Sequence, residues 1–209
     1  SKSTVNNLID NSKFLPDVIK YDRYQPEFYE DTFTYINKRV TKSKIKKGVS
    51  LYKKEKEIIK KIEKNFFVNK ELLLALMGIE TNFGKYLGKM DIISSLATLS
   101  FDKRRSKFFT NELLTLLKLV DSEIVDHKVL YGSWAGAFGN FQFMPSTIQN
   151  NAIDYNDDSL IDLKSPEDSF ASAANYLSKM GWNTKGKCFN EISLDENIPI
   201  KYLNYSARK

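Results

Sequence analysis

The chain has little of the side-chain chemistry that metal sites and disulfide frameworks use. Its 209 residues include one cysteine and one histidine. A single cysteine excludes an intramolecular disulfide and a multi-cysteine metal site, and a single histidine excludes a histidine-rich one. Neither Cys188 nor His127 lies in a motif. We therefore expect an ordinary half-buried thiol and a solvent-facing imidazole.

Long hydrophobic runs are also missing. The longest uninterrupted apolar run is Leu72–Ile79, far short of the roughly 20 residues that span a bilayer. No charged-then-apolar leader begins at Ser1, so a signal peptide is either missing or already removed. Hydrophobic residues make up 42% of the chain and charged residues 28%, a composition typical of a folded globular protein. With no repeat and no linker, residues 1–209 are expected to form a single unit.

The positive charge is unevenly distributed. Residues 1–70 carry 17 Lys and Arg against 9 Asp and Glu, whereas residues 71–209 carry 15 against 17. This pattern predicts a basic helical lobe over about residues 1–64, suited to a polyanion, although a solvated lysine-rich face is the alternative. Because 27 of the 32 basic residues are lysine, the arginine-rich contacts of nucleic-acid surfaces are not indicated. We predict no nucleic-acid partner.

Apolar spacing predicts a mainly helical fold. Helices are expected over Lys53–Phe67, with Ile58, Ile59, Ile62 and Phe66 as the apolar stripe, and over Leu72–Thr81, which is apolar nearly all round and so expected to be buried. A third is expected over Phe108–Val120, with a stripe of Leu113, Leu114, Leu116 and Leu117. Ser165 and Pro166 predict the start of a helix that ends near Gly181. Strand signals are weak and confined to residues after Lys187.

Glu80 is the acidic residue with the most apolar neighbours in sequence. It directly follows the run Leu72–Ile79 and precedes Thr81-Asn-Phe-Gly84. A carboxyl group attached to a buried helix has its charged form disfavoured by desolvation, which raises its pKa toward the range of a general acid. The alternative is a glutamate at a helix end that turns out to water.

A second segment alternates small and aromatic residues between Gly132 and Pro145 and carries Gln142 within an apolar run. A half-buried glutamine requires hydrogen-bond partners, and a pocket that binds a sugar or an amide supplies them. A tight packing site between helices, with Gln142 capping a neighbour, is the alternative.

Together the two segments resemble a known enzyme family. Glu80-Thr-Asn-Phe-Gly84, followed by Gly136-x-x-Gly139-x-x-Gln142-Phe-Met-Pro145, looks like the lysozyme-like lytic transglycosylases. The closer resemblance is to the membrane-bound lytic transglycosylase B family (glycoside hydrolase family 103). It extends from about Val5 to Tyr205 and includes Leu96–Phe101, Arg104-Arg105, Gly132-Ser133 and Ala173-x-Asn175-Tyr176 followed by Gly181-Trp182.

The resemblance implies cleavage of the β-1,4 bond between N-acetylmuramic acid and N-acetylglucosamine in peptidoglycan, without water. Glu80 matches the family's single acid and base. It would protonate the glycosidic oxygen and then, as carboxylate, remove the proton from the muramoyl C6 hydroxyl, which closes a 1,6-anhydro ring. Glycosidases that use two carboxylates need a second acid, and Asp91, Asp102 or Glu112 could fold back to supply one.

Further residues match by position. Ser133 and Gln142 match residues that line the saccharide groove, and Tyr35 matches an active-site tyrosine that can stack on a sugar. Arg104 and Arg105 match a basic pair suited to substrate carboxylates; surface ion pairs are the alternative for these two. Asn204 matches an active-site asparagine, although Leu203 stands where the family has an aromatic residue.

Acidic and amide residues alternate in the loop 154–168, as in a calcium-binding loop: Asp154, Asn156, Asp158, Leu160 and Asp168. The loop has Ser159 where glycine is expected and Ser165 at the usual position of a closing glutamate. The resembling family carries a longer loop closed by Asp168. A structural Ca²⁺ or Na⁺ is thus predicted, whereas no cofactor is expected to be required. Asp168 also suits the first turn of a helix, so the two roles compete.

These observations predict a mainly α fold: a lysozyme-like α+β core over about residues 65–209, including the loop 154–168, with an additional helical lobe and a small, strand-poor loop region. The expected partner is a peptidoglycan glycan strand in the periplasm, and the expected state is a monomer. Association with the outer membrane would require a lipid anchor outside this chain. A hydrolytic muramidase and a non-catalytic peptidoglycan-binding scaffold remain alternatives.

Overall fold

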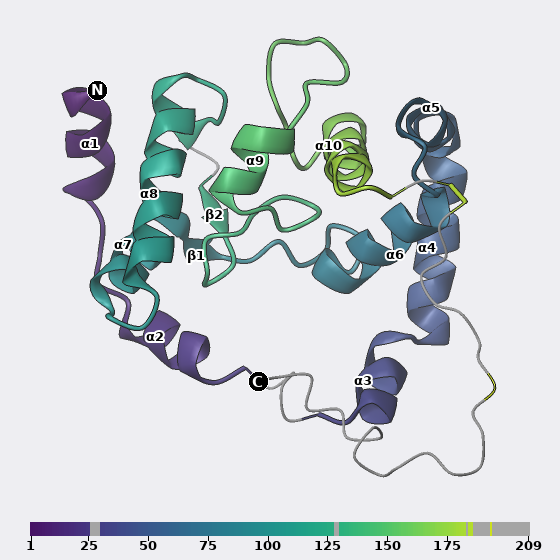
Figure 1. The fold of residues 1–209 in the computed structure, drawn as a ribbon, viewed down its shortest axis with the longest axis horizontal. Helices are drawn as coiled ribbons and strands as arrows, with labels where there is room; N and C mark the ends of the chain where they lie inside the picture. Colours follow the sequence, from purple (N-terminus) through teal and green to yellow (C-terminus); the bar gives the residue numbers. More distant parts are fainter. Residues whose placement is uncertain (26–29, 128–129, 183, 186–192, 194–209) are drawn as a thin grey trace.

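A computed structural model describes residues 1–25, 30–127, 130–182, 184–185 and 193 (Figure 1). The first helices are α1 (Lys2–Ile9), α2 (Pro16–Arg23), α3 (Thr32–Arg39), α4 (Lys42–Lys54), α5 (Lys56–Phe66) and α6 (Lys70–Thr81). They are followed by β1 (Met90–Asp91), α7 (Ile92–Phe101), α8 (Ser106–Asp121), β2 (Tyr131–Gly132), α9 (Pro145–Asn151) and α10 (Pro166–Lys179). The predicted mainly helical class is confirmed.

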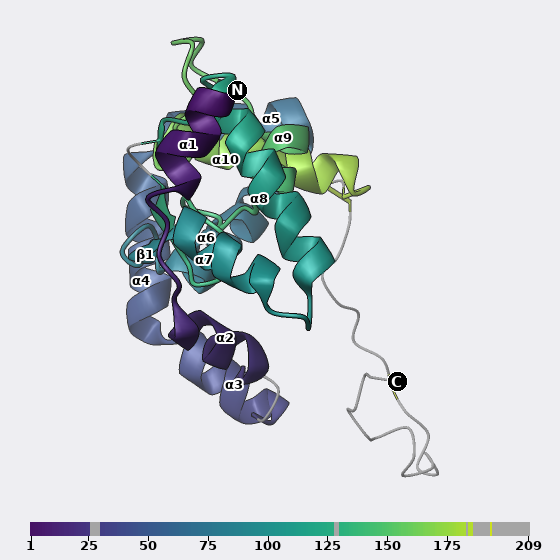
Figure 2. The same ribbon diagram turned by 90° about the vertical axis from the view of Figure 1, so that its left-hand side faces the viewer.

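The core is centred on α7, in which seven of the ten residues are buried. The helix α8 packs along α7, and α9 packs against both α8 and α10. The helices α1 and α2 both contact α7, and they lie above and below it in Figure 2. Burial of α7 is favourable because its sequence, IISSLATLSF, has no charged residue and its polar side chains are the small ones of serine and threonine.

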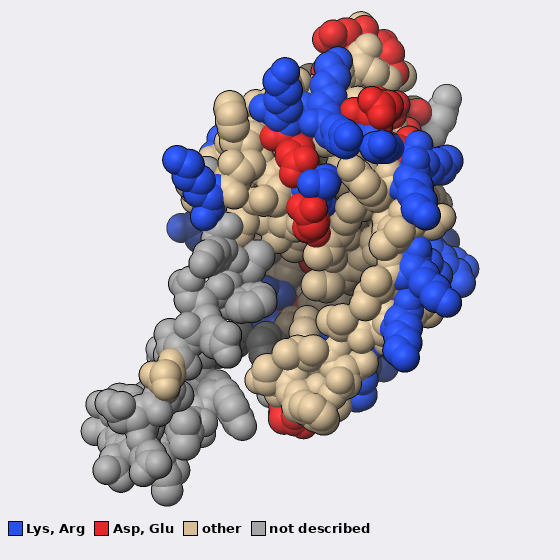
Figure 3. Space-filling model, turned by 90° about the vertical axis from the view of Figure 1, so that its right-hand side faces the viewer, with Lys and Arg blue, Asp and Glu red and all other residues tan. Residues whose placement is uncertain are grey.

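The lysine-rich N-terminal region does not gather on one side of the molecule. The helices α1 and α2 lie beside α7 and α8, whereas α4 and α5 lie on the opposite side, against α6 and α10 (Figure 1). On the side of the molecule where α4 and α5 lie, lysine and arginine side chains extend across the top and down the right-hand margin, with acidic side chains between them (Figure 3). Any basic wall is therefore formed by α4 and α5 rather than by the whole of residues 1–64.

The predicted helix over Lys53–Phe67 begins later than expected, because α4 ends at Lys54 and α5 starts at Lys56. The predicted apolar stripe is confirmed, with Ile59 and Ile62 fully buried. In α8 the predicted stripe is rotated: Leu116 and Leu117 are buried, but Leu114 is 52% exposed. The buried face of α8 instead includes Phe109, Glu112 and Leu119, all at helical spacing with Leu116.

The prediction that the helix over Leu72–Thr81 is buried is wrong for one of its faces. Leu73 and Met77 are buried, but Ile79 is 47% exposed and Ala75 is exposed as well. This helix therefore has a buried face and an apolar face that borders a surface groove. Hydrophobic composition alone could not separate the two faces, because both are apolar.

The helix predicted to begin at Ser165 is confirmed. The Ser165 side chain accepts a hydrogen bond from the Asp168 N–H at 3.1 Å, and Pro166 occupies the first turn of α10. The chain leaves α10 through Gly181 at φ +95°, beyond the last helical turn. This is the left-handed geometry for which glycine is favoured.

Within the described residues the sheet is one antiparallel pair, with Met90 opposite Gly132 and Asp91 opposite Tyr131. The two-residue strands were not predicted, because so short a segment carries no alternating pattern. The strands predicted after Lys187 lie outside the described residues, as does Cys188. No helix in the described part of the chain is long and apolar enough to cross a membrane.

Candidate active site

Glu80 lies on the last turn of α6, and the turn that follows fixes its position. Three successive residues, Asn82, Phe83 and Gly84, have φ values of +50°, +61° and +77°. The Thr81 hydroxyl holds this turn: it donates to the Asn140 carbonyl oxygen at 2.8 Å and accepts from the Gly84 N–H at 3.0 Å. Thr81 is fully buried. It therefore joins the end of α6 to the loop 132–144.

Two hollows meet at Glu80. The first, of about 260 Å³, is walled by α6, the loop 141–144 and α10, and is lined by Leu76, Glu80, Phe141, Gln142, Phe143, Met144, Thr147, Ala173, Tyr176 and Leu177. The second, of about 320 Å³, is walled by α4 and the turn after α6, and is lined by Thr41, Ser43, Lys44, Lys47, Ile79, Glu80, Thr81, Asn82 and Tyr86. A chain lying through both hollows would pass Glu80 at its middle.

Desolvation raises the pKa of the Glu80 carboxyl above its ordinary value. The side chain still reaches solvent, but the surrounding walls remove part of its hydration, which disfavours the charged form. The first hollow is mostly apolar, whereas the second brings Lys44 and Lys47 to its rim. A carboxyl group with a raised pKa at the edge of a groove is suited to donate a proton.

Gln142 lines the same hollow as Glu80, so the structure brings these two predicted residues together. The backbone at Gln142 has φ +50°. Its side-chain amide nitrogen donates to the carbonyl oxygens of Gly139 at 3.0 Å and Leu87 at 3.3 Å. Hence the side chain is held in place, half-buried, at the wall of the hollow.

Ser133 does not line either hollow beside Glu80. It closes the turn after β2, where its hydroxyl oxygen accepts a hydrogen bond from the Ala137 N–H at 3.0 Å. Tyr35 lies on α3, half-buried, with the Arg39 guanidinium 3.8 Å from its ring centroid. Among the described residues no hydrogen bond, ion pair or ring contact joins Tyr35 or Ser133 to Glu80.

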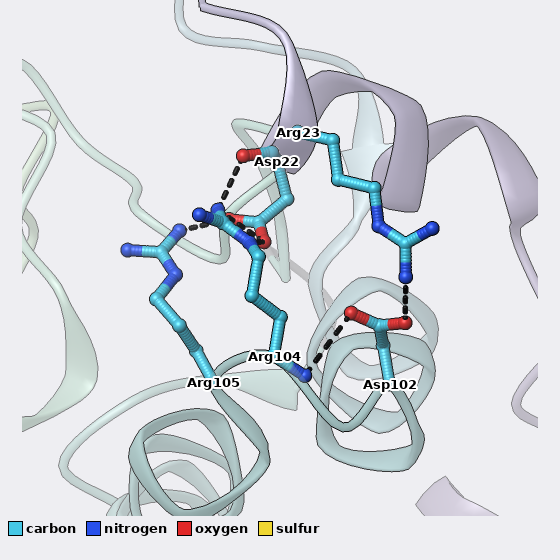
Figure 4. A network of polar contacts seen from close by, with 5 residues as sticks. All are labelled: Asp22, Arg23, Asp102, Arg104 and Arg105. Atoms are coloured by element: carbon cyan, nitrogen blue, oxygen red, sulfur yellow. Dashed lines mark hydrogen bonds and ion pairs between the residues drawn. The ribbon is translucent and has the colours of Figure 1, made fainter.

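Arg104 and Arg105 converge on Asp22 (Figure 4). The Asp22 side chain is only 1% exposed. One of its oxygens accepts from Arg104 Nε at 2.6 Å, the other pairs with Arg105, and the Asp22 carbonyl oxygen accepts from Arg104 as well. Beside them, Arg23 and Asp102 pair at 2.6 Å. These contacts join α2 to the connection between α7 and α8. Both arginines thus form ion pairs, which was the alternative to substrate binding; a substrate role for them stays a prediction.

The other carboxylates that could have supplied a second catalytic acid are engaged elsewhere. Asp91 accepts from the Ser94 N–H at 2.6 Å at the start of α7. Glu112, buried in α8, accepts from the N–H and hydroxyl of Ser146 at 2.9 and 2.6 Å. With Asp102 paired to Arg23, none of the three lines a hollow beside Glu80.

The loop 154–168 satisfies its carboxylates with its own backbone. Asp154 accepts from the Ser159 N–H at 2.8 Å, and Asp158 accepts from the Leu160 N–H at 2.9 Å. Asp168 accepts from the N–H groups of Tyr155 and Asp162, both at 2.8 Å. In the part of the chain that the structure describes, no three acidic, histidine or cysteine side chains are placed to hold a metal ion. The donor types suit calcium, but the carboxylates here accept hydrogen bonds from backbone N–H groups, which a bound ion would have to displace.

Burial raises the pKa of the Asp168 carboxyl, and the nearby charges of Asp154 and Asp158 raise it further, against the two N–H donors that lower it. Asp168 also lies in the first turn of α10, below the Ser165 cap. Its carboxylate bonds the N–H groups of Tyr155 and Asp162, whereas the Ser165 side chain caps the helix; a metal-binding role for Asp168 stays a prediction. The side chain of Asn156 donates to Asp158 at 2.8 Å and completes the loop's internal bonding.

The structure adds residues to the site that were not predicted from the sequence. Tyr86, 61% exposed, lies beside Glu80 in the second hollow, and Lys44 and Lys47 read in sequence only as parts of a charged helix face. The position of Tyr86, two residues after Gly84 and close in sequence to Glu80, was the one feature of the sequence that could have indicated it. Asn204 lies outside the described residues. His127 is exposed, as predicted.

Comparisons with known proteins point in one direction. A family model described as Transglycosylase SLT domain matches residues 1–209. The chain is 36% identical over 149 residues to membrane-bound lytic murein transglycosylase B of Escherichia coli (strain K12), covering 71% of this chain and 41% of that protein.

Solved structures are similar in fold. SltB3 from Pseudomonas aeruginosa, in complex with NAG-NAM-pentapeptide, matches with a TM-score of 0.89 and 31% identity over 95% of this chain and 53% of that one. The Escherichia coli lytic transglycosylase Slt35, in complex with calcium, matches with a TM-score of 0.80 and 31% identity over 88% of this chain and 59% of that one. The chain thus spans about half the length of the relatives it matches.

Proposed function

Because the chain belongs to the transglycosylase SLT domain family, we propose that it is a lytic transglycosylase. It would cleave the β-1,4 bond between N-acetylmuramic acid and N-acetylglucosamine in peptidoglycan and leave a 1,6-anhydro ring. The whole of residues 1–209 would act as a single catalytic unit, with the glycan lying through the two hollows that meet at Glu80.

One observation carries this proposal. Among the described residues, Glu80 is the one carboxyl group that lines the two hollows. Retaining and inverting glycosidases need a second carboxylate about 5–10 Å from the first, either as nucleophile or to activate water. A groove with one carboxyl group instead suits a reaction in which the substrate's own hydroxyl is the nucleophile.

In this mechanism Glu80 acts twice. As a carboxylic acid, which its raised pKa favours, it gives its proton to the glycosidic oxygen as the bond to the muramoyl C1 breaks. As the resulting carboxylate, it removes the proton from the C6 hydroxyl, whose oxygen attacks C1 and closes the ring. The departing N-acetylglucosamine carries the first proton, and Glu80 ends the cycle protonated again.

The remaining site residues would bind the sugars. Gln142, held at the wall of the first hollow, would present its amide to a sugar, and the exposed ring of Tyr86 offers a stacking surface in the second. Binding roles for Tyr35, Ser133, Arg104, Arg105 and Asn204 complete the proposal; they are supported by the match in position alone. The arginines would have to share their donors between Asp22 and the substrate.

The test is the product released from purified peptidoglycan, analysed by mass spectrometry. Wild-type protein should release anhydromuropeptides, and Glu80→Gln should release almost none. Glu57→Gln, an exposed acid on α5, is the matched control and should behave as wild type. Products with reducing ends would identify a hydrolytic muramidase, and binding without any product would identify a non-catalytic scaffold.

The proposed setting follows from the substrate. Peptidoglycan glycan strands are the partner, and they place the protein, acting as a monomer, in the periplasm. Association with the outer membrane would need a lipid anchor outside these residues. A related structure holds calcium. We extend this to a structural cation at the loop 154–168, where it would relieve the repulsion among Asp154, Asp158 and Asp168.

A further inference from the structure

Asn140 is a buried amide in the loop 132–144, with only 4% of the residue exposed. It lines neither of the two hollows that meet at Glu80. Its side-chain nitrogen donates to the Lys164 carbonyl oxygen and to the Ser169 hydroxyl oxygen, both at 3.0 Å. Because a carbonyl oxygen only accepts, the Lys164 contact fixes which end of the amide carries the nitrogen. A buried amide whose two N–H groups are both bonded is held in one orientation.

The backbone of Asn140 bonds in two further directions. Its N–H donates to the Leu163 carbonyl oxygen at 2.8 Å, and its carbonyl oxygen accepts from the Thr81 hydroxyl at 2.8 Å. The side-chain oxygen lies close to the same turn, since a Cβ atom at Gly84 would be 3.0 Å from Asn140 Oδ1. One residue thus joins the chain before α10, the helix α10 itself and the turn that follows Glu80.

The residues around Asn140 leave it little freedom to shift. Phe138 and Phe143 exchange backbone hydrogen bonds of 3.1 and 3.0 Å, which close the chain between them into a tight turn. Gly139 has φ +79°, and a Cβ atom there would lie 2.6 Å from Leu163 Cβ. Only glycine fits at this distance, so the backbone of the turn lies directly against Leu163. The contact fixes the distance between Asn140 and the start of α10.

The other end of this connection is the acidic loop 154–168. Ser169, which accepts from Asn140, donates its own hydroxyl to the Ser165 carbonyl oxygen in the first turn of α10. The preceding residue, Asp168, holds the loop through two backbone N–H donors, both at 2.8 Å. A change in the loop that moves Asp168 would also move Ser169 and, through Asn140, the turn after α6.

The carboxyl group of Glu80 has no hydrogen-bond or ion-pair partner of its own in the part of the chain that the structure describes. Its position is therefore set by the backbone of the turn after α6, which is held through Thr81 and Asn140. We infer that Asn140 is a positioning residue for Glu80, because it fixes this turn against α10. Both carboxyl oxygens then stay available for the glycosidic oxygen and the C6 hydroxyl of the substrate. This inference rests on the proposed function, in which Glu80 acts first as an acid and then as a base.

The test compares two buried serines of α10, which are 1% and 0% exposed. Ser169→Ala removes a hydroxyl that is bonded to Asn140, whereas Ser172→Ala removes one that accepts from the Ile153 N–H at 3.0 Å. Ser169→Ala should lower kcat for release of anhydro product about fivefold, and Asn140→Ala about thirtyfold, with KM in both within about twofold of wild type. The control Ser172→Ala should leave kcat and KM within about twofold, although its Tm falls as far as that of Ser169→Ala.

A second measurement reports the place of the carboxyl group directly. Desolvation raises the pKa of Glu80, so a displaced and better hydrated carboxyl group titrates at lower pH. The alkaline limb of the pH–rate profile should move down by roughly half a pH unit in Asn140→Ala and stay in place in Ser172→Ala. A ¹³C NMR titration of Glu80, assigned with Glu80→Gln, should show the same shift without turnover. All variants keep the other titratable groups that line the two hollows, namely Lys44, Lys47, Tyr86 and Tyr176.

The outcomes separate this inference from the proposed function. If wild-type protein releases no anhydro product, the proposed function fails, and the NMR titration still tests whether Asn140 positions Glu80. If Asn140→Ala does not fold, the comparison of Ser169→Ala with Ser172→Ala decides. If these two variants have equal kcat and the same Glu80 titration, Asn140 contributes to stability alone and the inference is overturned.

Discussion

Replacing Thr81 with valine tests how the fold positions Glu80. Valine keeps the branched shape of threonine, so the fully buried side chain still fills its site, but the hydroxyl is lost. The Asn140 carbonyl oxygen then loses its donor at 2.8 Å, and the Gly84 N–H loses its acceptor at 3.0 Å. The perturbation thus removes the connection between the end of α6 and the loop 132–144 without opening a cavity.

The magnitude follows from the two groups left without partners. A buried polar group that loses its hydrogen bond costs about 1–3 kcal/mol. The Asn140 carbonyl is buried and the Gly84 N–H is only partly so, which places the expected loss in the free energy of unfolding at about 2–3 kcal/mol. For a chain of this length, this corresponds to a fall in Tm of roughly 4–12 °C.

Activity should fall as well, because Glu80 is the preceding residue. A displacement of about 1 Å in a catalytic group can cost about a hundredfold in rate. We expect Thr81→Val to lower kcat for release of anhydro product by roughly ten- to a hundredfold. The effect on KM should be smaller, since the walls of both hollows are otherwise intact.

Thermal and urea unfolding followed by circular dichroism would measure the stability, and product release from peptidoglycan would measure the activity. Thr81→Ser is the matched control. It keeps the hydroxyl and loses one methyl group, so it should cost only about 1 kcal/mol and preserve most of the activity. If Thr81→Val unfolds within about 0.5 kcal/mol of wild type, the hydroxyl does not hold the turn and the reasoning is refuted.

Three further predictions concern charge. Because folding raises the pKa of Glu80, Glu80→Gln should unfold at a higher temperature than wild type at pH 7. This difference in Tm should vanish below pH 4.5, the ordinary pKa, where the carboxyl group is protonated in both the folded and the unfolded state. The rate of cleavage by wild-type protein should decline as the pH rises through the raised pKa. Asp22→Asn should lower the free energy of unfolding in urea by about 2 kcal/mol. This loss is smaller than for a fully buried pair because both arginines are about 40% exposed. The control Asp17→Asn, in an exposed pair with Lys20, should change the free energy of unfolding by less than about 0.5 kcal/mol. Millimolar calcium should raise Tm in wild type but not in Asp158→Asn, and the absence of a shift in wild type would retire the cation site.

Much of the site was predictable because its chemistry is local in the sequence. Glu80 stands out through the apolar run before it, and Gln142 stands out as an amide among apolar residues. The N-terminal cap of α10 at Ser165 could also be predicted, since capping depends on a few adjacent residues. Desolvation of Glu80, and hence the direction of its pKa shift, followed from the same local pattern.

Other features depended on partners far away in the sequence. Arg104 and Arg105 bind Asp22, more than 80 residues earlier, and no local pattern distinguishes that pairing from a substrate site. The roles of Asp102 and Glu112 were open for the same reason, because Asp102 pairs with Arg23 and Glu112 accepts from Ser146. The rotation of the α8 stripe at Leu114 likewise depends on which helices surround it.

The sequence by itself determined the helical class, the place of Glu80 at the end of an apolar helix, and the N-terminal cap of α10, because helix periodicity and capping act over a few residues. Only the tertiary structure decided that Glu80 lies where two hollows meet and that no second carboxyl group of the described residues reaches them. Tertiary packing also placed an apolar face of α6 opposite α4, with Phe83 between them. The physical reason is that enclosure and charge pairing are properties of side chains brought together by packing, which sequence spacing does not specify.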